Sequence, residues 1–132
     1  MGLENIDRKE LVKYRLENAK STFAEVPTHL QNKFYKTAIN RLYYSCYYAA
    51  TALLINDGYE THTHNGVKTL LALHFIKENK INISLGKMYG QLFNMRQESD
   101  YEDWISPDEN DVKNFLEPVE QFISSIDKLI SA

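Results

Sequence analysis

The sequence predicts an all-α fold, a four- to five-helix up-and-down bundle, in a single domain that spans residues 1–132. Only five glycines and three prolines interrupt the chain, and apolar residues recur at helical spacing without the strict alternation typical of strands. The length matches about one domain of roughly 150 residues. Hydrophobic residues make up 43% of the chain, which is enough to form a core.

Two helices are expected in the N-terminal part. The first is capped by Asp7 and reaches about Val26, where Pro27 ends it. The second runs from about Leu30 to Asn56 and stops at Asp57-Gly58. Helical spacing of about 100° per residue gives the first helix an inward face at Leu11, Tyr14, Ala19 and Phe23. The core stripe of the second helix is Ala38, Ile39, Leu42, Cys46, Ala49, Ala50 and Leu53.

Three more helices are expected after a loop at residues 61–66. The next helix carries Val67, Leu70, Leu71, His74 and Phe75. Ser84 is the expected cap of the following helix, whose stripe is Leu85, Met88, Tyr89, Leu92, Phe93 and Arg96. Ser106-Pro107-Asp108-Glu109 predicts a capping box with Ser106 as N-cap. Pro118 predicts a kink in the last helix, whose apolar residues are Val112, Phe115, Leu116, Val119, Phe122, Ile123, Ile126 and Ile130.

Charge and cysteine content exclude several classes of protein. A net charge of −3, from 15 basic and 18 acidic residues, excludes a nucleic-acid footprint over the whole chain. The single Cys46 excludes an intrachain disulfide and predicts a buried, unreactive thiol. His62 and His64 are a weak metal pair at most, so no metal or other cofactor is expected. Without a signal-like N-terminus or an apolar run of about 18 residues, the sequence predicts a cytoplasmic protein with no membrane or DNA partner.

Acidic residues gather toward the C-terminus. Residues 97–132 hold 10 acidic and 2 basic side chains, against 8 and 13 in residues 1–96. One interpretation is a solvated loop followed by an acid-rich first helical turn, which the helix dipole favours. The other is a docking surface for a basic partner, or a guard against non-specific nucleic-acid binding.

The second expected helix is unusually rich in tyrosine. Arg41, Tyr44, Ser45 and Tyr48 fall within an arc of about 100° opposite its core stripe. This arrangement predicts a second covered surface, against another helix or a second copy of the chain. Arg41 is then either a buried structural arginine paired with tyrosine hydroxyls or a carboxylate, or an arginine presented to phosphate in an aromatic-walled cleft.

Arg96 interrupts an apolar stripe, and Asp100 follows it about 40° away on the same helix. Charged groups on an inward face must be paired or line a cleft. The sequence leaves both interpretations open, a local Arg96–Asp100 pair and a functional cleft.

Four blocks of the sequence resemble the HEPN (higher eukaryotes and prokaryotes nucleotide-binding) domain family, in particular its stand-alone prokaryotic branch. Together they span roughly residues 8–130 in the family's order. The blocks are residues 38–50 around Asn40-Arg41-Leu42-Tyr43-Tyr44, then Thr63-His64-Asn65-Gly66-Val67, then His74-Phe75, and then Met95-Arg96-Gln97-Glu98-Ser99-Asp100-Tyr101.

The resemblance implies a helical bundle that pairs as a homodimer, often encoded beside a minimal nucleotidyltransferase in a toxin–antitoxin-like pair. It also implies a kinship with metal-independent endoribonucleases, in which an Arg and a His four to six residues later form a composite site at the dimer cleft. In that site the Arg stabilises the developing phosphorane charge and the His transfers the proton.

This sequence departs from the Arg-then-His motif. The window after Arg96 holds Asp100, Tyr101 and Glu102, with Tyr101 in the closest register. A tyrosine titrates near about 10 and is a poor general base at neutral pH. His64 or His74 would substitute only if packed beside Arg96, and nothing in the sequence places either of them there.

We therefore predict a HEPN-like domain that dimerises and binds a nucleotide or RNA phosphate, as one half of a two-component system and without the usual ribonuclease chemistry. Arg96 would contact the phosphate, Asp100 would orient it and Tyr101 would line the cleft. Arg41 and Tyr44 would come from the facing helix. Two alternatives remain: an active metal-independent endoribonuclease using Arg96 with an atypical base such as Tyr101, and a non-catalytic protein-interaction module.

Overall fold

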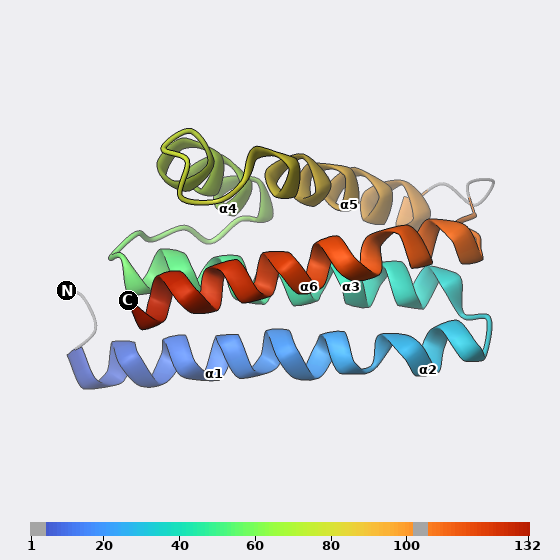
Figure 1. The fold of residues 1–132 in the computed structure, drawn as a ribbon, viewed down its shortest axis with the longest axis horizontal. Coiled ribbons are helices and arrows are strands. Elements are labelled where there is room, and N and C mark those ends of the chain that lie inside the picture. Colours follow the sequence, from blue (N-terminus) through green and yellow to red (C-terminus); the bar gives the residue numbers. More distant parts are fainter. Residues whose placement is uncertain (1–4, 102–105) are drawn as a thin grey trace.

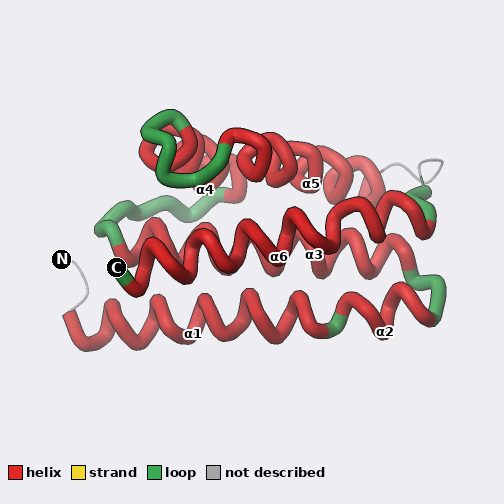
Figure 2. Tube along the Cα trace, viewed as in Figure 1, coloured by secondary structure: helices red, strands yellow, loops and turns green. Residues whose placement is uncertain are grey.

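The computed structural model describes the backbone of residues 5–101 and 106–132, and the side chains of residues 7–97 and 106–132. Over these residues the regular structure is helical, with no strand, which confirms the all-α prediction (Figure 2). The elements are α1 (Asn5–Ala24), α2 (Val26–Gln31), α3 (Tyr35–Asn56), α4 (His64–Leu71), a π-helical turn η1 (Ala72–Ile76), α5 (Ile83–Tyr101) and α6 (Glu109–Ser131).

Helix α3 is the centre of the bundle. It packs against α1, α2, α4, α5 and α6. Figure 1 shows α1 and α2 in line along one side, α3 and α6 in the middle, and α4 and α5 on the opposite side. Tyr43 of α3 contacts His64 of α4 and Tyr89 of α5, so the tyrosine-rich part of α3 lies beside α4 and α5.

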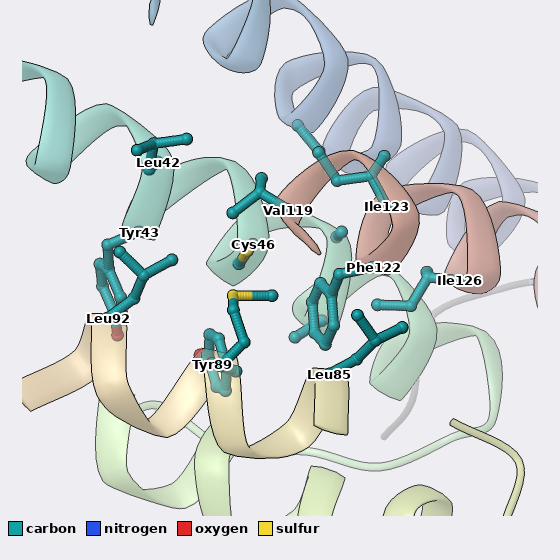
Figure 3. Close-up of a cluster of buried hydrophobic side chains, with 14 of the residues drawn as sticks. Leu42, Tyr43, Cys46, Leu85, Tyr89, Leu92, Val119, Phe122, Ile123 and Ile126 are labelled. Atoms are coloured by element: carbon teal, nitrogen blue, oxygen red, sulfur yellow. The ribbon is translucent and has the colours of Figure 1, made fainter. Parts of the chain in front are cut away.

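The core follows the stripes predicted for α3, α5 and α6. All seven residues predicted for the α3 core stripe are at most 1% exposed. In Figure 3, Leu42 and Cys46 of α3 meet Leu85, Tyr89 and Leu92 of α5 and Val119, Phe122, Ile123 and Ile126 of α6. The rings of Tyr89 and Phe122 stack with their centroids 5.5 Å apart, which joins α5 to α6.

The prediction for the first helix is wrong in three respects. Asp7 is not its N-cap, because α1 already begins at Asn5 and Asp7 lies within its first turn. Tyr14 is 60% exposed, because the buried face runs through Val12, Leu16 and Ala19, and Tyr14 lies about 200° from Val12 around the helix. Pro27 does not end the helical region but stands in the first turn of α2. A proline is tolerated in a first turn because the N–H that it lacks would be unpaired there.

Both predicted serine caps are wrong, because a nearby Asn or Asp makes the stronger contacts. Asn82 Oδ1 accepts hydrogen bonds from the backbone N–H and the hydroxyl of Ser84, both at 2.8 Å. At the start of α6, Asp108 Oδ1 accepts from the Asp111 N–H and Asp111 Oδ2 accepts from the Asp108 N–H, each at 2.9 Å. This box uses two carboxylates, which the helix dipole favours. Helix α6 then continues through Pro118.

No helix in the described part of the chain is both long and apolar enough to cross a membrane. The same residues contain no group of three or more His, Cys, Asp or Glu side chains that could hold a metal ion.

Candidate functional site

Tyr43 is the point at which α3, α4 and α5 meet. Its side chain is fully buried, and a hydrogen bond of 2.7 Å joins its hydroxyl to Nδ1 of His64 on α4. The Arg96 guanidinium of α5 lies over the Tyr43 ring, 4.9 Å from its centroid. The Tyr43 ring also stacks on Tyr89 at 5.9 Å, and Figure 3 shows these two side chains of α3 and α5 next to each other. One tyrosine therefore holds an arginine and a histidine that are 32 positions apart in the sequence.

His64 is held in place by the start of its helix and by aromatic neighbours. Thr63 is the N-cap of α4, and its Oγ1 accepts a hydrogen bond from the Gly66 N–H at 2.8 Å. The His64 ring stacks on Tyr47 with centroids 4.2 Å apart, and meets Tyr44 edge to face at 5.7 Å. These contacts give the imidazole a fixed orientation against α3.

The electrostatics of the site keep His64 neutral and Tyr43 protonated. Burial lowers the pKa of His64, and the nearby positive charge of Arg96 lowers it further. Burial raises the pKa of Tyr43 to about 12. At neutral pH, His64 is thus an uncharged imidazole. In the tautomer whose Nδ1–H donates to the Tyr43 hydroxyl, its Nε2 is the nitrogen that can accept a proton.

The ring of Tyr44 lies near both predicted arginines, Arg41 and Arg96. The Arg41 guanidinium lies 5.4 Å from the Tyr44 ring centroid and that of Arg96 lies 5.8 Å from it. Arg41 also donates two hydrogen bonds to Asn40 Oδ1, at 3.1 and 2.8 Å. We refer to the six residues around this point as the Arg–His cluster: Arg41, Tyr43, Tyr44, Tyr47, His64 and Arg96.

The structure thus brings together three of the five predicted site residues, Arg41, Tyr44 and Arg96. The side chains of the other two, Asp100 and Tyr101, lie outside the described residues, and so does the proposed Arg96–Asp100 pair. Of the two histidines considered as substitutes, His64 belongs to the cluster. His74 does not, because its ring stacks on Tyr59 with centroids 4.4 Å apart.

Comparison with known proteins identifies the family. The sequence model of the HEPN domain matches residues 12–129. The chain belongs to the HEPN family. A UPF0332 protein of Thermotoga maritima is 31% identical over 124 residues, which are 94% of each chain. Two proteins of Methanocaldococcus jannaschii are also similar. The one named "Putative toxin MJ0605" is 27% identical over 98% of this chain and 96% of its own. The one named "Putative toxin MJ0142" is 28% identical over 93% of this chain and 83% of its own.

In this HEPN chain Arg96 and His64 both contact Tyr43, although no histidine stands four to six residues after Arg96. A guanidinium binds phosphate oxygens in a fixed fork and stabilises added negative charge. A neutral imidazole accepts or returns a proton near neutral pH. The cluster thus contains the two chemical groups that phosphate binding and metal-free proton transfer require.

Proposed function

We propose that this HEPN protein binds a nucleotide or RNA phosphate at the Arg–His cluster. The observation that carries the proposal is that Arg96 and His64 contact the same tyrosine, Tyr43. The Arg96 guanidinium lies 4.9 Å from the centroid of the Tyr43 ring, and His64 Nδ1 lies 2.7 Å from the Tyr43 hydroxyl. The guanidinium would bind the phosphate oxygens, and the tyrosine rings of α3 would stack against a base. The neutral state of His64 avoids a third positive charge beside Arg41 and Arg96, so the ring contributes a directional hydrogen bond instead.

We also propose that the chain is the toxin-like half of a two-component system and acts as a homodimer. Two relatives that match nearly the whole chain carry the name "Putative toxin", and the family resemblance suggests a minimal nucleotidyltransferase as the other component. Tyr44 and Tyr48 are only half-buried on α3, which leaves aromatic surface for a second copy beside the cluster. Co-purification with the product of a neighbouring nucleotidyltransferase gene, and light scattering of the purified chain, test these two expectations.

A fluorescent RNA oligonucleotide, titrated in EDTA and followed by anisotropy, tests phosphate binding. Arg96→Gln should weaken binding about tenfold or more, because a charge-assisted hydrogen bond is worth about 1.5–3 kcal/mol. Lys20→Gln is the matched control, since Lys20 is 54% exposed and pairs with Asp127 at 2.8 Å, between α1 and α6. Equal affinities for both variants and the wild type would contradict the proposal.

His64 favours a second candidate function, metal-independent RNA cleavage. In this reaction His64 takes the proton of a ribose 2′-hydroxyl, the 2′ oxygen attacks the adjacent phosphorus, and the 5′ oxygen leaves with a proton returned to it. Arg96 would stabilise the negative charge of the phosphorane. The products are a 2′,3′-cyclic phosphate and a 5′-hydroxyl end.

Cleavage of the same RNA in EDTA separates this function from binding alone. Cleavage by the wild type that both His64→Gln and Arg96→Gln abolish would establish the reaction. RNA that the wild type binds but leaves intact would limit the function to binding.

A further inference from the structure

A pocket adjoins the Arg–His cluster and shares one residue, Tyr47, with it. The pocket has a volume of about 220 Å³. Its walls come from α1, from the C-terminal half of α3, from the segment that joins α3 to α4, and from Val67 of α4. The lining residues that matter for a ligand are Arg15, Tyr47, Thr51, Tyr59, Thr61 and His62.

Arg15 presents a cation to this pocket. Its Nε is buried and, among the described residues, has no hydrogen-bond partner. Buried N–H groups are nearly always paired in folded proteins, so such a group calls for an acceptor. The charge of Arg15 also acts on Tyr47. Burial raises the pKa of Tyr47, and the positive charge of Arg15 offsets part of that rise. Arg15 thus combines a positive charge with a donor that the surrounding part of the protein leaves unused.

The other walls restrict the class of ligand. Tyr47 and Tyr59 supply aromatic rings, Thr61 supplies a hydroxyl, and none of the lining residues is acidic. The Thr51 hydroxyl already donates to the Tyr48 carbonyl at 2.8 Å, so it offers only an acceptor. A guanidinium, a hydroxyl and aromatic rings together suit a phosphate attached to a sugar and a base. The volume lies below the range of about 300–1,000 Å³ typical of pockets that enclose a whole drug-sized ligand. The pocket therefore fits part of one nucleotide rather than a longer strand.

The neighbouring contacts connect this pocket to the cluster. The ring of Tyr47 stacks on His64 at 4.2 Å and also lines the pocket. A ligand group near His64 and one at Arg15 would therefore both lie beside Tyr47.

We propose that the Arg15 pocket binds the phosphate end of a nucleoside phosphate, next to the phosphate held by the Arg–His cluster. The placement on a common strand rests on the proposed function, whereas the phosphate chemistry of the pocket does not. The nucleoside phosphate is either a unit of a bound RNA or a free mononucleotide.

The first experiment is a titration of the isotope-labelled protein with AMP, with adenosine and with inorganic phosphate, followed by amide NMR shifts. AMP should shift the amide signals of Thr51, Thr61 and Val67, and adenosine should shift them less. Arg15→Gln should weaken AMP binding about tenfold or more, and Arg15→Lys should restore part of it. Lys13→Gln is the control, because Lys13 is an exposed cation on the same helix and its loss should change the affinity less than twofold.

A six-nucleotide RNA distinguishes the two sources of the ligand. If the pocket holds a unit of the strand, Arg15→Gln weakens RNA binding as well, and AMP competes with the RNA. If it holds a free mononucleotide, Arg15→Gln weakens AMP binding and leaves RNA binding unchanged. Melting temperatures show whether each variant is folded. If Arg15→Gln does not fold, Arg15→Lys is compared with the wild type in both titrations, where the loss of the guanidinium fork should still weaken binding, though less than Arg15→Gln.

Different results would contradict the pocket proposal and the proposed function. If folded Arg15 variants bind AMP and RNA as tightly as the wild type does, and RNA binding still requires Arg96, the pocket proposal is overturned and the proposed function stands. RNA binding that does not depend on Arg96 would overturn the proposed function, while Arg15-dependent AMP binding would still support the pocket.

Discussion

Tyr43→Phe tests the central contact of the site by removing one hydroxyl and keeping the ring. The phenylalanine ring fills the same buried space and still faces the Arg96 guanidinium. What is lost is the 2.7 Å hydrogen bond to His64 Nδ1. The net value of such a bond is about 0.5–1.5 kcal/mol. Because His64 is half-buried, water can reach part of its ring and limit the cost.

We therefore expect Tyr43→Phe to lower the free energy of unfolding by about 1 kcal/mol. For a chain of this length that corresponds to a melting temperature about 4 °C lower. Urea unfolding followed by circular dichroism measures the change. Tyr48→Phe is the control, since the Tyr48 hydroxyl has no hydrogen-bond partner among the described residues, and it should change stability by less than about 0.5 kcal/mol.

The same variant should weaken RNA binding, because His64 loses the partner that orients its imidazole. An unchanged or higher stability for Tyr43→Phe would refute the contribution assigned to this hydrogen bond. A lower stability with unchanged RNA affinity would make Tyr43 a structural residue and would remove the link between the tyrosine and the site.

Three other perturbations test the core, the start of α4 and the ionisation of His64. Phe122→Ala should cost about 3–5 kcal/mol in urea unfolding, because the fully buried ring leaves a cavity; a cost below about 1 kcal/mol would contradict its burial. Gly66→Ala should destabilise the chain and weaken RNA binding, since a Cβ there would overlap the Thr61 side chain; a neutral result in both assays would show that the segment adapts. The pKa of His64 is lowered by burial and by Arg96, so below about pH 6.5 the unfolded chain binds more protons than the folded one. The free energy of unfolding should therefore fall as the pH drops from about 6.5 to the lowered pKa, and an equal fall in His64→Gln would contradict this assignment.

The helices and most core residues follow from local periodicity. The spacing of apolar residues predicted the buried faces of α3, α5 and α6, because a helix repeats every 3.6 residues whatever surrounds it. Periodicity failed for Tyr14, where the apolar pattern of the first helix is weak and permits more than one phase. The caps at Ser84 and Ser106 failed because Asn82 and Asp108 offer competing acceptors within two residues.

The site was only partly predictable for a related reason. Arg96 stood out because it interrupts an apolar stripe, and Arg41 and Tyr44 stood out because they share the face opposite the core stripe of a tyrosine-rich helix. His64 lies at a helix start in a segment whose path depends on tertiary contacts, such as the stacking of Tyr59 on His74. The sequence contained a signal for it in the Thr63-His64-Asn65-Gly66 block, but its distance from Arg96 could come only from the fold.

The most direct test of the Arg–His cluster is a double-mutant cycle on RNA affinity with Arg96→Gln, His64→Gln and the double variant. If both side chains hold one phosphate, the second substitution should cost less than it does alone, with a coupling energy above about 0.5 kcal/mol. Additive effects, or no effect of either substitution in variants that melt like the wild type, would contradict the assignment of these two residues to one phosphate-binding site.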